Sequence, residues 1–146
     1  MSTWSAEAAQ RDSERQEFSR LQMEKSLQDR RILDTKGNML WAQLRSLLGA
    51  KCNEFNGEPG KIGTFSCDAH LLQCKIWLTG THHCIIGRYS DWTLHFLGIK
   101  PLRYEAYWHV NLTTDGLGVW LSDNENCPVT LDEISDAVLE TLLASR

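Results

Sequence analysis

The stretch LRYEAYWHV, residues 102–110, alternates strictly between two kinds of side chain. Successive side chains of a β-strand point to opposite faces, so a period of two predicts a strand with one face on a core. The even-numbered residues supply the apolar face, and the odd-numbered residues Arg103, Glu105, Tyr107 and His109 supply a mixed one. This is typical of an antiparallel sheet with one solvated face.

The same period of two recurs on both sides of this stretch. Turn residues such as Thr79-Gly80, Ser90-Asp91 and Asp115-Gly116 separate the alternating segments. Short connections favour pairing between neighbours, so we expect a meander. The predicted strands lie near residues 62–67, 71–78, 82–89, 92–97, 102–110 and 117–121, which makes a six-stranded antiparallel sheet.

Helical patterns flank the sheet. Residues 5–31 contain no Gly or Pro, favour a helix and offer only a thin apolar stripe. DTKGN, residues 34–38, is expected to interrupt the pattern before a core helix over 39–55. After a loop over 122–130, TLDE at 130–133 predicts a capping box that starts the last helix.

This order of elements predicts the α+β class, with the N-terminal and C-terminal helices packed on one face of the sheet. We divide the chain into an N-terminal charged helical arm, residues 1–35, and a single α+β domain, residues 36–146. With 146 residues, the chain is long enough for one compact core.

The composition argues against several classes of partner and several cellular compartments. The formal net charge of −4 argues against nucleic acid as a partner. No apolar run reaches the roughly 18 residues of a membrane span, and the N-terminus lacks the apolar core of a signal peptide. We therefore expect a cytoplasmic protein, with no membrane partner and with its five cysteines as free thiols.

TGTHHCIIG, residues 79–87, raises the question of a metal or nucleophile site. A two-residue turn at Thr79-Gly80 would pair Lys75 with Cys84 and Cys74 with Ile85, which places the two cysteines on opposite faces. The chain has no Cys-x-x-Cys pair to anchor zinc. His83 and Cys84, as strand neighbours, would point apart. We therefore expect no metal, no cofactor and no catalytic residue here.

The mixed face of the sheet is the candidate binding surface, because large aromatic groups beside histidines suggest that something covers them. Its residues are Trp77, His83, His95, Arg103, Tyr107, His109 and Trp120. The cover could be the chain's own N-terminal helix, a protein partner such as a second copy in a homodimer, or a small-molecule ligand.

We therefore predict a non-enzymatic protein-interaction or adaptor module that self-associates through the N-terminal arm or the aromatic face. The alternative is a small-ligand-binding protein or an enzyme with a pocket between the sheet and the helices. In that case His83, His95, Tyr107 and His109 are the acid–base candidates. The sequence indicates no reaction, no substrate and no particular partner.

Overall fold

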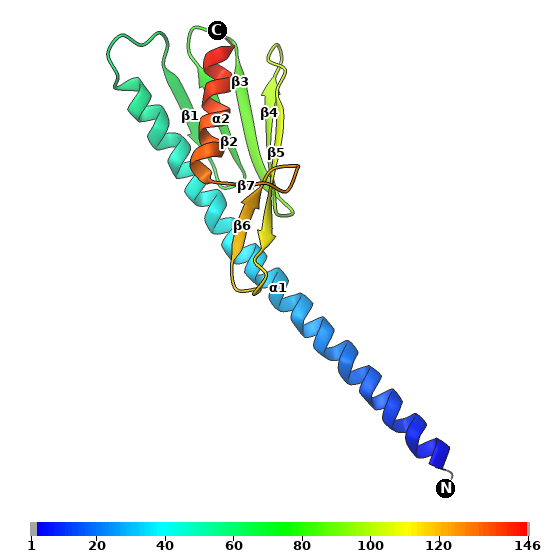
Figure 1. The fold of residues 1–146 in the computed structure, drawn as a ribbon. Coiled ribbons are helices and arrows are strands. Elements are labelled where there is room, and N and C mark those ends of the chain that lie inside the picture. Colours follow the sequence, from blue (N-terminus) through cyan, green and yellow to red (C-terminus); the bar gives the residue numbers. More distant parts are fainter. Residues whose placement is uncertain (1–2, 146) are drawn as a thin grey trace.

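The computed structural model describes residues 3–145 and shows an α+β fold with one curled antiparallel sheet (Figure 1). A long helix, α1 (Thr3–Asn56), precedes all the strands, and α2 (Leu131–Ala144) follows them. The strands are β1 (Phe65–Ala69), β2 (Gln73–Leu78), β3 (Cys84–Ser90), β4 (Thr93–Ile99), β5 (Glu105–Leu112), β6 (Val119–Ser122) and β7 (Pro128–Val129). They pair in chain order, each with the next.

The predicted meander is confirmed, but the sheet has seven strands rather than six. The additional strand, β7, consists of two residues within the segment predicted as a loop. Val129 pairs with Leu121 and Pro128 pairs with Ser122. Two residues are too short a segment to show a period, and proline is depleted in strands, so the sequence pattern gave no sign of this strand.

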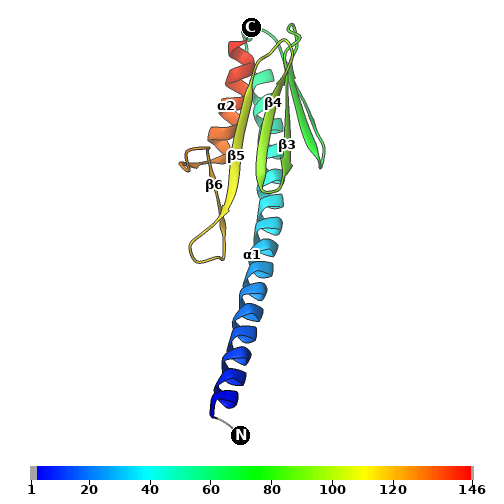
Figure 2. The same ribbon diagram turned by 90° about the vertical axis from the view of Figure 1, so that its right-hand side faces the viewer.

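The alternation in β5 is as predicted. Trp108 and Val110 are buried, and Tyr104 and Ala106 pack against the core, whereas Glu105 and Tyr107 are exposed. The apolar face of the sheet meets α1 and α2, which lie on the same side of it (Figures 1 and 2). The fully buried side chains of this layer include Leu44, Leu48, Ile76, Ile85, Leu94, Phe96, Ile134, Val138 and Leu142.

The predicted break in the N-terminal helix is wrong. α1 runs without interruption for 54 residues, about 80 Å, and includes residues 34–38. Gly37, the residue that suggested the break, is buried against the sheet, and a Cβ atom there would lie 2.1 Å from the hydroxyl oxygen of Tyr89. Glycine is therefore a packing requirement at this point of the helix. The division of the chain at residue 35 stays a prediction.

The two-residue hairpin turn at Thr79-Gly80, the condition on which the register above was worked out, does not form. Trp77 pairs with Cys84 and Ile76 pairs with Ile85, so the connection between β2 and β3 spans residues 79–83. The register is shifted by two residues, and a shift by two leaves every side chain on its expected face. Cys74 and Cys84 thus lie on opposite faces, as predicted.

Side-chain contacts hold the helix ends in place. Asn56, at the end of α1, accepts from the backbone N–H of Phe65 and donates to its carbonyl oxygen, both at 2.8 Å. Lys51 of α1 donates to Ser135 Oγ and to Asp136 Oδ1 of α2, each at 2.7 Å. The capping box is confirmed, since Thr130 and Glu133 exchange both expected hydrogen bonds.

Candidate functional site

The side of the sheet that faces away from α1 and α2, called here the outer face, carries most of the predicted binding residues. Strand pairing places His95 between Arg88 of β3 and Tyr107 of β5. The next cross-strand pairs between β3 and β4 on this face are apolar, with Leu97 beside Ile86 and Ile99 beside Cys84. The outer face therefore combines aromatic, aliphatic and ionisable side chains in one continuous surface.

His95 and Tyr107 form the centre of the outer face. Their rings are stacked with centroids 4.3 Å apart and planes within 2°. The hydroxyl of Tyr107 donates to Oε1 of Glu105, the same oxygen that lies 3.5 Å from His95 Nε2. This hydrogen bond raises the pKa of Tyr107, because ionisation would set two negative charges together. Tyr107 is therefore poorly suited to act as a general base.

The other predicted residues have separate local partners. Trp120 Nε1 donates to the carbonyl oxygen of Leu112 at 3.2 Å, and His109 Nε2 lies 2.9 Å from Asn124 Oδ1. The ammonium group of Lys75 lies 5.7 Å from the ring centroid of Trp77. These contacts fix the orientation of the side chains, but they do not bring them together around a common point.

Two predicted residues lie away from the strands of the outer face. His83 belongs to the connection before β3, where its Nδ1 lies 2.7 Å from Ser145 Oγ at the end of α2. Arg103 is exposed in the connection between β4 and β5. The four acid–base candidates are thus dispersed, and the structure brings only His95 and Tyr107 into contact.

The hollows on and beside the outer face are small. The one beside Ile86, Arg88 and His95 has a volume of about 60 Å³, and the one that Trp77 and His83 help to line has a volume of about 260 Å³. Sites for drug-sized ligands have volumes of roughly 300–1,000 Å³. Leu97, Ile99 and Tyr107 are nevertheless more than one third exposed. A broad contact surface fits this arrangement better than a catalytic cleft.

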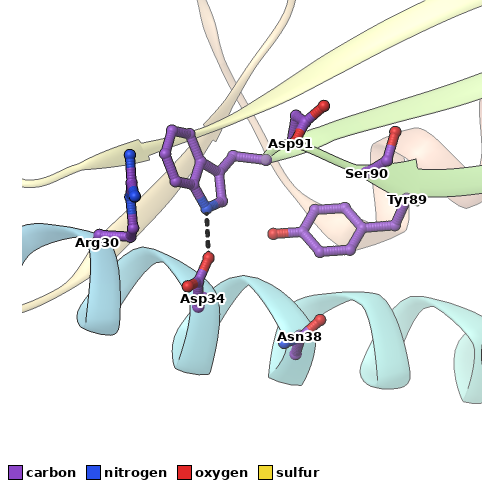
Figure 3. Close-up of a pocket in the computed structure, with 7 residues that line it drawn as sticks. Arg30, Asp34, Asn38, Tyr89, Ser90 and Asp91 are labelled. Atoms are coloured by element: carbon purple, nitrogen blue, oxygen red, sulfur yellow. Dashed lines mark hydrogen bonds between the residues drawn. The ribbon is translucent and has the colours of Figure 1, made fainter.

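A larger cavity, of about 500 Å³, lies where α1 meets the turn between β3 and β4 (Figure 3). Trp92 Nε1 donates to Asp34 Oδ1 at 2.8 Å, while the hydroxyl of Tyr89 is buried without a partner. Asp91 and Trp92 have φ angles of 48° and 60°, a backbone region that L residues rarely occupy. The cavity is lined by Arg30, Asp34, Asn38, Tyr89, Ser90, Asp91 and Trp92.

Sequence reasoning did not identify this cavity, because it treated residues 34–38 as a break between two helices. In the continuous helix, Arg30, Asp34 and Asn38 follow one another at steps of four residues, which places them on one face. That spacing is a usable signal only once the helix is known to continue through Gly37.

The third candidate surface is the part of α1 that extends beyond the strands, residues 3–28, called here the free arm (Figures 1 and 2). Its last turn is not isolated, because Lys25 and Gln28 line a hollow together with the connection between β5 and β6. All of its residues except Ala8 are exposed, and partial burial begins at Asp29. Each of its large apolar side chains keeps about half or more of its surface exposed. These side chains are Trp4, Phe18, Leu21, Met23 and Leu27.

No helix among residues 3–145 combines the length and the apolar content needed to cross a membrane. Comparisons of the chain with protein families, with curated proteins and with solved structures found no match.

Proposed function

We propose that the protein is a non-enzymatic interaction module that self-associates through its free arm. The observation that carries this proposal is the exposure of large apolar side chains along a helix that stands clear of its own core. A mostly polar helix that packs against no other element is only marginally stable in water. A second helix would cover the apolar groups and stabilise the arm.

One stripe of the free arm carries three of its large apolar side chains, Trp4, Phe18 and Leu21, among five polar positions. Steps of three and four residues alternate from Trp4 to Gln28 along one stripe. This heptad spacing places residues along a single seam, as in coiled coils. The seam, as we use the term, consists of Trp4, Glu7, Arg11, Glu14, Phe18, Leu21, Lys25 and Gln28, all of them exposed.

The charges on the seam favour an antiparallel pair of arms over a parallel one. In a parallel pair in register, each charged residue meets itself, so Glu14 faces Glu14 and Lys25 faces Lys25. An antiparallel pair centred between residues 19 and 20 sets Phe18 against Leu21 of the second copy. The same register sets Glu14 against Lys25, and each of these contacts occurs twice. One alignment therefore matches Phe18 with Leu21 and Glu14 with Lys25, whereas Trp4 falls opposite Thr35, beyond the free arm.

The antiparallel register also brings two carboxylates of like charge together, and ion pairs within each helix offset their repulsion. Glu17 of one copy and Glu24 of the other would lie beside the seam on the same flank. Arg20 forms ion pairs with both Glu17 and Glu24 within its own helix. Each carboxylate thus already has a cationic partner before association.

A charge-exchange experiment tests the proposal and its register. Glu14→Lys and Lys25→Glu should each weaken association roughly tenfold, because each creates two like-charge contacts. The double variant should restore association, since the ion pairs re-form with their signs exchanged. Asp12→Lys, an equal charge change off the seam, is the matched control. Sedimentation equilibrium under reducing conditions gives the dissociation constants.

The possible outcomes separate three situations. A wild-type chain that stays monomeric at several hundred micromolar contradicts self-association. Failure of the double variant to recover contradicts the antiparallel register. If Leu97→Asp on the outer face abolishes association while the arm variants do not, the outer face is the interface instead.

A ligand-binding role is the second candidate, because the cavity at the turn between β3 and β4 gathers charged groups of both signs beside the buried, unpartnered hydroxyl of Tyr89. Arg30 offers a positive charge, while Asp34 and Asp91 offer negative ones, so the lining suits a small zwitterion. Titration with free amino acids should then shift the indole N–H resonance of Trp92. An unchanged resonance with the whole set would remove this candidate.

A further inference from the structure

Three cysteine thiols from three elements meet inside the domain. Cys52 lies on the buried stripe of α1, Cys67 on β1 and Cys74 on β2. The pairs Cys67–Ile76 and Ala69–Cys74 put both strand cysteines on the face that meets the helices, as diagonal neighbours. The Sγ atoms of Cys67 and Cys74 are 3.6 Å apart.

The three thiols differ in access and in acidity. Cys52 and Cys74 are buried, whereas Cys67 is partly exposed on the edge strand β1. Hydrogen bonds from Cys52 and then from Cys74 stabilise the Cys67 thiolate and lower the pKa of that thiol. The hydrogen bond to Cys67, together with burial, raises the pKa of Cys74. Cys67, the least buried residue of the three, is thus also the one whose thiolate is stabilised, with a neutral thiol held beside it.

We propose that Cys67 is a hydroperoxide-reactive thiol and that Cys74 resolves its oxidised form to a disulfide. This inference rests on the geometry of the cluster and is independent of self-association through the free arm. A hydroperoxide is the oxidant, and the two thiols supply both electrons.

The reaction balances in two steps. The Cys67 thiolate attacks the terminal oxygen of the hydroperoxide, the O–O bond breaks, and the leaving alkoxide or hydroxide takes up a proton. Cys67 is then a sulfenic acid. The sulfur of Cys74 next attacks Cys67 Sγ and the S–O bond breaks. The hydroxide leaves as water with the Cys74 proton, so two thiols become one disulfide and the hydroperoxide becomes an alcohol, or water.

The placement of the two sulfurs favours Cys74 over Cys52 as the resolving thiol. Cys67 and Cys74 belong to one hairpin and lie near its connecting end, where β1 is bordered by a strand on one side only. Completing the bond requires a shift of this edge, because diagonal neighbours start farther apart than residues that face each other directly. Cys52, which hydrogen-bonds to Cys67 from α1, is the competing thiol. Among residues 3–145, no group of three metal-ligating side chains is placed to hold a metal ion.

The test compares Cys67 with Cys127, an exposed thiol in the turn before β7. The reduced full-length chain is treated with limiting hydrogen peroxide, quenched with N-ethylmaleimide in acid and mapped by mass spectrometry. The Cys67–Cys74 disulfide should be the first product, and Cys67 should react about tenfold faster than Cys127. In Cys74→Ser, dimedone should capture a sulfenic acid on Cys67. Cys127→Ser should behave like the wild type.

Two results would overturn the proposal: oxidation of Cys127 at least as fast as Cys67, or a wild-type disulfide between Cys52 and Cys67. The wild-type map decides between these outcomes even if Cys74→Ser fails to fold. The disulfide forms within one chain, whereas the charge-exchange experiment measures association between chains. Either experiment can therefore give a negative result while the other gives a positive one.

Discussion

The two halves of α1 share one continuous helix but have opposite surroundings. In residues 29–56, Trp41, Leu44, Leu48 and Cys52 are buried against the sheet and α2. In the free arm, residues 3–28, no residue is buried. The comparison shows that one helix passes from a packed environment to an exposed one without a break. The docked half supplies a formed nucleus, and an arm free of Gly and Pro extends it.

The largest expected difference between the two halves is in core packing. Leu44→Ala should lower the free energy of unfolding by about 2–5 kcal/mol, because it opens a cavity at a fully buried position. The matched change Leu21→Ala on the free arm should stay within about 0.5 kcal/mol. Urea unfolding at low protein concentration measures both. Equal losses would mean that the free arm is part of the folded core.

The next difference concerns the two glycines of the docked half. A Cβ at Gly37 would meet the Tyr89 hydroxyl, whereas a Cβ at Gly49 would meet nothing within 4 Å. Gly37→Ala should destabilise by about 1–2 kcal/mol, since overpacking outweighs the gain in helix propensity. Gly49→Ala should stabilise by about 0.5–1 kcal/mol. Thermal unfolding compares them.

Adding Tyr89→Phe to Gly37→Ala should recover part of the loss, because it removes the atom that the new methyl group meets. No recovery, or a stabilising Gly37→Ala, would show that α1 and β3 are not in contact at this point.

A smaller effect is expected where the docked half begins. Trp92→Phe removes the hydrogen bond to Asp34 and should cost about 1 kcal/mol. Asp34→Ala should lower the free energy of unfolding by a similar amount, and the double variant should lower it no more than either single variant does. A double-mutant cycle from chemical denaturation checks this coupling. Simple additivity of the two losses would contradict a direct contact.

The smallest effect is expected within the free arm itself. Arg20→Ala removes the ion pairs with Glu17 and Glu24, both of them exposed to solvent. Amide hydrogen exchange in residues 3–28 should become faster, while the unfolding midpoint of the domain stays unchanged below the concentration of association. A drop in the midpoint would show that the arm contributes to the stability of the domain even in the monomer.

Local periodicity determined much of the architecture. The alternation at 102–110 predicted which side chains of β5 face the helices, and TLDE predicted the capping box of α2. These features follow from the period with which side chains alternate around a strand or a helix, and this period can be read directly from the order of residues. The prediction that His95, Tyr107 and their neighbours bind a partner stays untested.

The contacts between residues far apart in the sequence could be established only from the tertiary structure. DTKGN is a poor helix segment by propensity, yet it is helical, with Gly37 packed closely against Tyr89 and Asp34 bonded to Trp92. The meeting of Cys52 with Cys67 and Cys74 likewise depends on how α1 docks on the sheet. Propensity and period describe each element by itself, whereas such contacts depend on how the sheet curls and on which side chains fill the space between the elements.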